Sequence, residues 1–413
     1  MLKNFLFITW DGPQTSYMEG LFMPIFQEMS KKEAVQFHVL QFTWADQNKI
    51  SQTKVIAKQM GIHYTALPIL RKPNASAGSL VTVFTSVKKI KKYIREHQID
   101  IVMPRSTFPA LMINQILKVP FKGFRSRSFQ LIFDADGLPL EERVDFAGLQ
   151  RSSYLYRFLK AAETKMLRNA DAVITRSQKA IDIHVATLGE KHRKNFSVVF
   201  NGRDPEHFKI DVAARSKARK NLGIQSELVF VYAGSLGLQY CLPEMLQIFR
   251  NHSKNSPSKF LILTGNTAFA EEHIPEDLKP DIIIKSVPSE EVAFYLNAGD
   301  CAFALRQPSF SMQGVAPIKL GEYLLCGLPV IASKGIGDTE EILQKIPHCY
   351  LFDHENKNAV SGAANFVQSL KEIDHEAIRK SGLQYFSLSN SAESYIHVLS
   401  HLSLSESGPT PKY

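Results

Sequence analysis

Short apolar segments of strand length alternate with helical patterns along almost the whole chain. Such segments occur in both halves of the sequence, and helical periodicity fills most of the gaps between them. Strands that alternate with helices predict parallel sheets, because the helices supply the crossover connections. We therefore expect an α/β protein built from two Rossmann-like, doubly wound parallel-sheet domains. The expected strands are 4–9, 35–43, 62–67, 100–104, 129–134, 171–175, 196–200, 228–233, 259–264, 282–287, 301–305, 329–333 and 349–352.

The length of the chain also favours two domains. A chain of 413 residues is long for a single hydrophobic core. The dipeptide Asn201-Gly202 is a turn signal near the middle of the chain, which makes it a natural boundary. No internal repeat or low-complexity tract interrupts either half. The expected divisions are a first domain at 1–200, a second at 201–386, a final helix at 387–404 and a disordered polar tail at 405–413.

Composition points to a cytoplasmic globular protein. Hydrophobic residues make up 44% of the chain and charged residues 22%, as in ordinary soluble domains. The four cysteines (Cys241, Cys301, Cys326, Cys349) show no metal-type spacing and are expected to be reduced, packed thiols. The apolar part of residues 1–11 is too short for a signal peptide. No segment approaches the roughly 20 apolar residues of a membrane-spanning helix.

The stretch from Pro317 to Ser333 predicts a short buried helix followed by a buried strand. Pro317 suits the first helical position, and Gly327 suits the left-handed position just after the helix. The helix is apolar on nearly all sides, yet it contains Lys319 and Glu322. A buried charge needs a partner. We therefore expect that a ligand can supply the missing partner.

This stretch resembles the donor-site signature of glycosyltransferase family 4, in its short Pro-x-Lys-x-x-Glu-Tyr form. The family consists of retaining, nucleotide-sugar-dependent enzymes with the GT-B fold. The resemblance implies that Pro317, Ile318, Lys319 and Glu322 bind the donor and that Glu322 accepts the ribose hydroxyls. One carboxylate can accept both hydroxyls of a vicinal diol. The alternative is a helix whose lysine and glutamate simply reach solvent.

A glycine turn after the strand at 228–233 predicts a phosphate site. Free backbone N–H groups at such a turn, followed by a helix near Leu242, attract anions. In the resembling family this turn lies against the donor diphosphate, which implicates Gly234, Ser235, Leu236 and Gly237. Many members follow the turn with an arginine and a lysine, but this chain has Gln239 and Tyr240. We expect Lys319 and Arg306 to supply the positive charge instead.

Two further segments resemble parts of the family's donor site, and one element of its pattern is missing. The strand and loop ending at Val287 resemble the segment that holds the nucleotide base. The loop 335–339 could approach the sugar or a phosphate, although Asp338 or Thr339 is expected simply to cap the next helix. The full family pattern has a glutamate eight positions before Glu322, where this chain has Gly314. Recognition of the transferred sugar therefore differs from the full pattern.

Polar residues at strand ends in the first half are the candidates for acceptor binding. Ligands of parallel sheets collect at the carboxyl ends of the strands. The acceptor candidates are Asp11, Gly12, Arg105, Asp134 and Asp136. Asp134-Ala135-Asp136 also matches the short metal-binding signature of the GT-A class. The GT-B resemblance assigns the diphosphate to positive groups, so we expect no metal and no cofactor.

The net charge of +9 has a local component in the first domain. Residues 83–95 place Val83, Val87, Ile90 and Ile94 on one helical stripe, with basic residues around the rest. This pattern fits an amphipathic helix on an anionic membrane, or a solvated helix that packs its stripe on the sheet. No base-reading motif accompanies it, so nucleic acid is not an expected partner. The basic residues are Lys88, Lys89, Lys91, Lys92 and Arg95, with a second cluster at Lys122, Arg125 and Arg127.

The resemblance implies a metal-independent retaining glycosyltransferase that acts in cell-surface polysaccharide synthesis. It implies a first domain that binds a glycan or lipid-linked acceptor, a second that binds a UDP- or GDP-linked sugar, and a final helix that crosses back to the first domain. The transferred group would be a hexose or an N-acetylhexosamine, with Lys319, Arg306 and Glu322 in the catalytic site. Such an enzyme would act in the cytoplasm, with the inner membrane face as a possible contact. The alternatives are a sugar-nucleotide epimerase and a noncatalytic partner subunit with the same fold.

Overall fold

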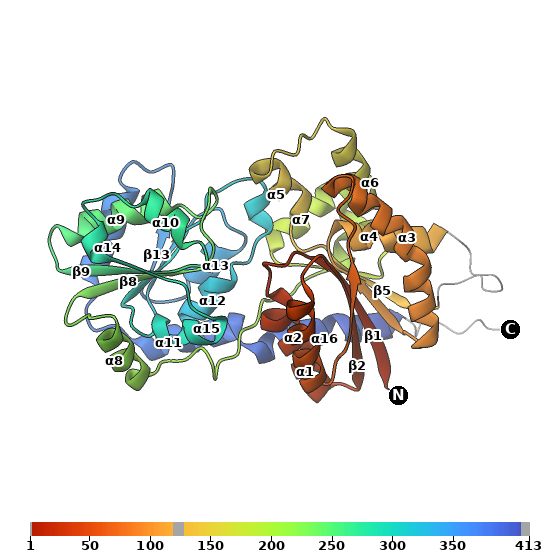
Figure 1. Ribbon diagram of the computed structural model, residues 1–413, viewed down its shortest axis with the longest axis horizontal. Helices are drawn as coiled ribbons and strands as arrows, with labels where there is room; N and C mark the ends of the chain where they lie inside the picture. Colours follow the sequence, from red (N-terminus) through yellow and green to blue (C-terminus); the bar gives the residue numbers. More distant parts are fainter. Residues whose placement is uncertain (1, 119–127, 406–413) are drawn as a thin grey trace. The chain divides into compact units, whose positions relative to one another are not determined.

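The computed structural model describes residues 2–118 and 128–405 (Figure 1). The chain forms two compact units, one made of Met1–Val199 with Ser391–Tyr413 and the other of Phe200–Asn390. Each unit contains one parallel sheet with helices on both faces. The second basic cluster noted in the sequence (Lys122, Arg125, Arg127) and the tail 406–413 lie outside the described residues.

The first unit is built on a seven-stranded sheet with the order β3-β2-β1-β4-β5-β6-β7. Every strand pair in it is parallel, and Phe5 of β1 lies opposite Phe37 of β2 and Ile101 of β4. The strand order reverses between β1 and β4, so their carboxyl ends flank the switch point at which ligands bind to such sheets. The strands are β1 (Lys3–Asp11), β2 (Val35–Thr43), β3 (His63–Pro68), β4 (Ile101–Pro104), β5 (Gln130–Asp134), β6 (Ala172–Thr175) and β7 (Phe196–Val198).

Alternating side chains of these strands pack on two separate helix layers. Phe5 and Phe37 face the layer that contains Phe26 of α1, whose ring stacks on Phe37 at 4.5 Å. Leu6 and Ile8 face the opposite layer. This is the two-residue period of a strand that is buried on both faces. The helices of this unit are α1 (Met23–Lys32), α2 (Gln47–Gln59), α3 (Ala75–Glu96), α4 (Thr107–Lys118), α5 (Pro139–Phe146), α6 (Tyr154–Asn169), α7 (Gln178–Leu188) and most of α16 (Leu388–Ser405).

Helix α3 contains the apolar stripe for which the sequence allowed two interpretations, contact with a membrane surface or packing in the protein core. Val83, Ile90 and Ile94 are fully or almost fully buried in the first core, and Val87 packs against it. The stripe is therefore satisfied inside the protein, and the solvent-facing surface of the helix carries the lysines. Within the described residues, no helix combines the length and the apolarity needed to cross a bilayer.

The second unit is built on a six-stranded parallel sheet with the order β10-β9-β8-β11-β12-β13. Here the strand order reverses between β8 and β11, and the carboxyl ends of these two strands lead into Gly234 and Arg306. The strands are β8 (Leu228–Ala233), β9 (Ser258–Leu263), β10 (Ile282–Lys285), β11 (Cys301–Ala304), β12 (Val330–Ser333) and β13 (Cys349–Phe352). The helices are α8 (Val212–Asn221), α9 (Leu242–Ser253), α10 (Thr267–His273), α11 (Ser289–Leu296), α12 (Ile318–Leu325), α13 (Thr339–Leu343), α14 (Ala359–Ser369) and α15 (His375–Phe386).

The predicted fold class and every predicted strand are confirmed, with strand ends that differ by no more than two residues. The helix signals of the 317–333 stretch need one correction. Pro317 is the extended residue before α12 (φ −67°, ψ 117°), not its first helical residue. Gly327 does have the expected left-handed backbone, with φ +69°. A Cβ at Gly327 would lie 2.8 Å from the carbonyl oxygen of His375, so close packing also requires glycine here.

Candidate functional site

The turn after β8 contains two glycines, Gly234 and Gly237, with backbone conformations that other residues rarely adopt. Gly234 has φ +140° and Gly237 has φ +150°. A Cβ at Gly234 would lie 2.8 Å from the Nζ atom of Lys319, whereas a Cβ at Gly237 would meet no atom within 4 Å. Gly234 is therefore required by its backbone conformation and also by the close approach of the lysine ammonium group.

Lys319 is a buried cation that makes no ion pair in the part of the chain that the structure describes. Its side chain comes from α12, and only 9% of the residue is exposed. Its Nζ atom donates to the Tyr232 hydroxyl at 2.7 Å and lies 3.9 Å from the centre of the Tyr232 ring. The Tyr232 hydroxyl in turn donates to the backbone oxygen of Ser235. Burial, and then the like charge of Arg306, lower the pKa of Lys319 well below its usual value.

Arg306 brings a second positive charge to the same edge of the sheet. It follows β11, and its backbone N–H donates to Ser333 Oγ at 2.9 Å. Its guanidinium group donates to Gln239 Oε1 at 3.2 Å and lies over the Tyr240 ring at 5.0 Å. Lys319 Nζ lies 4.7 Å from the centre of that same ring. Among the described residues neither basic side chain contacts a carboxylate, and a bound anion would favour the charged form of Lys319.

Glu322, one helical turn after Lys319, forms an ion pair with an arginine from a distant part of the chain. Its Oε1 atom lies 2.7 Å from Arg203 Nη2, and its side chain is 13% exposed. Arg203 lies in the segment that opens the second unit, and its guanidinium also lies 4.9 Å from the Phe208 ring. Lys319 therefore lies at the end of β8, whereas Glu322 is paired with the segment that opens the second unit. Glu322 is stabilised by Arg203, a residue that the sequence analysis did not single out.

The other predicted donor residues have varied environments. Leu236 is buried in the core, and Val287 follows β10 and packs partly on the second core. Gly314 lies in a short 3₁₀ turn (Ser311–Gly314), where it is buried. Asp338 directly precedes α13, but its side chain makes no capping hydrogen bond. Asp338 therefore occupies one of the two predicted N-cap positions, but without the side-chain hydrogen bond of such a cap.

The acceptor candidates in the first unit form a cluster of opposite charges. Arg105 Nη2 lies 2.5 Å from Asp136 Oδ2, and Arg176 Nη2 lies 2.7 Å from Asp134 Oδ2. Asp134 is fully buried, and Asp11 is 5% exposed. These two carboxylates are therefore buried partners of neighbouring groups, and Asp136, with a side chain that is 27% exposed, is the most accessible member of the cluster. Gly12 lies against Trp44, where a Cβ would approach the ring to 3.0 Å.

Both oxygens of Asp134 already have hydrogen-bond partners within the protein. One oxygen of Asp134 accepts from Arg176, and the other accepts from the backbone N–H of Asp136. A group with metal-type ligands does occur in the second unit, where the ligand atoms of Cys241, Glu244 and His354 lie within 4.8 Å of one another. Burial, followed by the charge of Glu244, raises the pKa of the Cys241 thiol to about 12. In this structure the cysteine is therefore a neutral thiol, and a thiolate forms there only if a cation displaces the proton.

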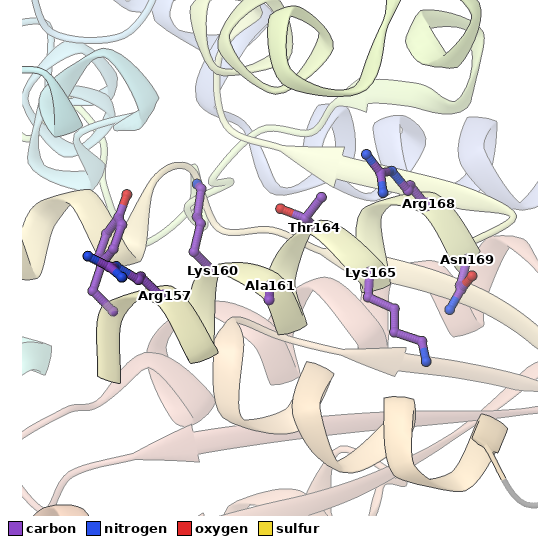
Figure 2. Close-up of a pocket in the computed structure, with 8 residues that line it drawn as sticks. Arg157, Lys160, Ala161, Thr164, Lys165, Arg168 and Asn169 are labelled. Carbon is purple, nitrogen blue, oxygen red and sulfur yellow. The ribbon is translucent and has the colours of Figure 1, made fainter. Parts of the chain in front are cut away.

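A shallow groove of about 590 Å³ follows α6 in the first unit (Figure 2). The side chains of Lys160, Thr164 and Arg168 lie on one side of the helix, and Lys165 lies on the other. Lys160 pairs with Glu141 and Glu163 at 2.9 and 2.5 Å. The groove contains none of the residues singled out in the sequence. The lining residues are Tyr156, Arg157, Lys160, Ala161, Thr164, Lys165, Arg168 and Asn169.

Comparisons with known proteins identify the fold. No family model and no curated protein matches the sequence. Among solved structures, the chain is similar to HepE of Anabaena in complex with UDP-glucose, with 14% identity and a TM-score of 0.68 over 96% of this chain and 99% of that one. It is similar to a glycosyltransferase of Rickettsia africae, with 12% identity and a TM-score of 0.69 over 98% and 100%.

A third similar structure belongs to another reaction class. It is a Listeria monocytogenes protein assigned as a UDP-N-acetylglucosamine 2-epimerase, with 12% identity and a TM-score of 0.57 over 99% of both chains. Identities this low establish architecture and leave activity to be argued from the site. Two parallel-sheet units of seven and six strands, matched over nearly their whole length by glycosyltransferase structures, show that this chain has the GT-B fold.

Proposed function

We propose that this chain is a glycosyltransferase that takes its sugar from a nucleotide-sugar donor bound to the second unit. The observation that carries the proposal is the pair of cations, Lys319 and Arg306, that meet the face of Tyr240 without a carboxylate partner in the described chain. A diphosphate supplies the negative charge that this pair lacks. The complex of the similar Anabaena structure with UDP-glucose supports a donor of this class.

The proposed donor lies along the carboxyl edge from the glycine turn to α12. Its diphosphate contacts the backbone at Gly234 and the ammonium of Lys319, which lie within contact distance of each other. Its ribose hydroxyls donate to Glu322, which is one helical turn further along α12. The base lies toward Val287. As the bond between sugar and phosphate breaks, negative charge grows on the leaving diphosphate, and fixed cations stabilise it.

The proposed reaction is metal-independent and retains the anomeric configuration. An oxygen of the leaving diphosphate takes the proton of the acceptor hydroxyl on the same face of the sugar. Orientation and charge stabilisation then supply most of the catalysis, so the site needs no separate nucleophile. The proposed acceptor is a glycan or a lipid-linked glycan of cell-surface polysaccharide synthesis, which binds the first unit near Arg105 and Asp136. A hexose or an N-acetylhexosamine is the proposed transferred group.

The direct test is a thermal-shift screen with UDP, GDP, ADP and inorganic pyrophosphate. A ligand at 100 times its Kd stabilises the folded state by about 2.7 kcal/mol, which is readily measured. We expect one nucleoside diphosphate to raise the melting temperature well above the others. If none does so at millimolar concentration, the proposed donor site is wrong.

A sugar-nucleotide epimerase is the second candidate, because a similar structure is assigned to that class. The two activities differ in what happens to the donor without an acceptor. A glycosyltransferase slowly hydrolyses one nucleotide sugar to nucleoside diphosphate and free sugar. An epimerase converts the sugar configuration and releases a product that is distinguishable by NMR. A noncatalytic partner subunit, suggested by Gly314 at the place of a glutamate, yields neither product.

A further inference from the structure

Arg203 and Glu322 form a partly buried ion pair in the second unit. The Arg203 Nη2 atom lies 2.7 Å from Glu322 Oε1, and the two side chains are only 15% and 13% exposed. A charge-assisted contact of this length in a partly buried place is far less screened than a surface ion pair. We propose that Arg203 is a positioning residue for ribose recognition, which it performs by holding the Glu322 carboxylate toward the nucleotide. This inference rests on the proposed function, because it assumes that a nucleotide occupies the site.

The geometry allows Arg203 to orient the carboxylate without occupying all of it. The ion pair engages Oε1, and no other hydrogen bond to Glu322 side-chain oxygens is found among the described residues. A carboxylate offers about four lone-pair sites on its two oxygens. One of them is used by the arginine, so sites for both hydroxyls of a vicinal diol remain. Arg203 therefore does not compete with the ribose for the same lone pairs.

The backbone of Arg203 is itself held in place. Its N–H donates to the Phe386 oxygen at 2.8 Å, and its own oxygen accepts from the Leu388 N–H at 2.9 Å. These two bonds form an isolated parallel bridge between the segment at Arg203 and the end of α15. The guanidinium group also lies against the Phe208 ring. A fixed arginine reduces the rotamer freedom that Glu322 would otherwise lose on ligand binding.

Removal of the Arg203 side chain should weaken only the part of nucleotide binding that comes from the ribose. A nucleoside diphosphate contacts both the cations and Glu322, whereas inorganic pyrophosphate contacts only the cations. Without Arg203 the carboxylate is no longer oriented, so hydrogen bonds to the 2′ and 3′ hydroxyls weaken. Binding of pyrophosphate does not depend on this orientation. The ratio of affinities for the ribonucleotide and its 2′-deoxy analogue therefore reports on Arg203 directly.

The experiment measures Kd by calorimetry for UDP, 2′-deoxy-UDP and pyrophosphate, with GDP and 2′-deoxy-GDP used instead if GDP binds more tightly. The proteins are the unmodified chain, Arg203→Ala, Arg203→Lys and Arg215→Ala. Arg215 is the matched control, because it pairs with Asp300 at 2.5 Å in the same unit, and within the described chain no hydrogen bond or ion pair joins it to α12. Circular dichroism melting establishes that each variant is folded.

We expect the unmodified protein to prefer the ribonucleotide by about tenfold or more, the usual size of one charge-assisted hydrogen bond. Arg203→Ala should bind both nucleotides alike and keep its pyrophosphate affinity within about twofold, and Arg203→Lys should recover part of the preference. Arg215→Ala should lower the melting temperature and leave the preference unchanged. If Arg203→Ala retains the full ribose preference, the inference is wrong while the proposed function stands. If the unmodified protein binds no nucleotide, both are wrong.

Discussion

The ammonium group of Lys319 occupies the space in which residue 234 would otherwise carry a side chain. A Cβ built on Gly234 would lie 2.8 Å from Nζ and 3.2 Å from Cε of the lysine. The first turn of the second sheet is thus shaped around a buried cation that comes from a helix 85 positions later in the chain. This relationship connects the two sequence features that suggested a donor site, the glycine turn and the charged helix.

Replacing Gly234 with alanine should abolish anion binding. The new methyl group meets the Lys319 ammonium, and the backbone at φ +140° is strained for any residue with a Cβ. Strain of this kind costs roughly 1–3 kcal/mol of folding stability. Gly237→Ala is the matched control, because it has similar strain at φ +150° and no neighbour within 4 Å. Urea unfolding of both variants measures the cost of backbone strain, and UDP titration measures the effect on anion binding. Equal loss of UDP binding in the two variants would show that backbone strain, and not Lys319, is responsible.

Replacing Glu322 with alanine should weaken nucleotide binding and leave pyrophosphate binding intact. The variant loses two hydrogen bonds to a charged acceptor, each worth roughly 1.5–3 kcal/mol. We expect the loss of transition-state stabilisation to be about 3–5 kcal/mol, which lowers kcat/KM for the donor by a hundredfold to a few thousandfold. Glu322→Gln should be nearly as damaging, because an amide offers one oxygen acceptor where the carboxylate has two. Normal nucleotide binding with a lowered melting temperature would instead make Glu322 a structural partner of Arg203.

The fold could be read from the sequence because local patterns determine it. Buried parallel strands give short apolar runs such as Val330–Ser333, and glycine at 327 marks a helix end through its left-handed backbone. The partners of buried charges could not be read in the same way. Arg203 and Glu322 are 119 positions apart, and no local pattern says that their side chains meet.

Tyrosines are the part of the candidate site that the sequence analysis missed. Tyr240 was noted only as the place where a cation is missing, yet its ring lies against both Lys319 and Arg306. Tyr232 lies inside a predicted apolar strand, where an aromatic ring is normally core. Its hydroxyl accepts a hydrogen bond from Lys319 at the end of that strand. The sequence alone does not show that the hydroxyl of such a core tyrosine belongs to a candidate binding site, because its partner Lys319 is distant in the chain.

Activity should survive removal of divalent metal ions. In the proposed site Lys319 and Arg306 provide the positive charge, and both oxygens of Asp134 are already bonded to Arg176 and a backbone N–H. We expect the rate of donor hydrolysis to change by less than about twofold in excess EDTA, well under the tenfold that 1.4 kcal/mol represents. Loss of activity that manganese or zinc restores would contradict this. The variant Cys241→Ser would then show whether the group of Cys241, Glu244 and His354 holds the ion.

The stability of the first unit should fall in mild acid because of His184. This imidazole is 2% exposed, and its Nε2–H donates to the Gly137 oxygen at 3.2 Å. Burial, with a contribution from Lys160, lowers the pKa of His184 to about 4. The unfolded chain, with a histidine pKa near 6.5, therefore binds the proton more readily between pH 6.5 and 4. Stability is complete above pH 6.5 and declines as the pH falls through this range.

The variant His184→Gln isolates this contribution, because glutamine can still donate to the Gly137 oxygen but does not titrate. A displacement from 6.5 to about 4 corresponds to roughly 3 kcal/mol at 1.4 kcal/mol per pH unit. Urea unfolding at pH 7 and pH 4.5 should show a smaller acid loss for the variant than for the unmodified protein. His38, whose pKa is also lowered to about 4 by burial and by His63 and His97, still titrates in the variant, so some acid loss remains. Equal acid losses in the two proteins would show that His184 gains its proton without unfolding the unit.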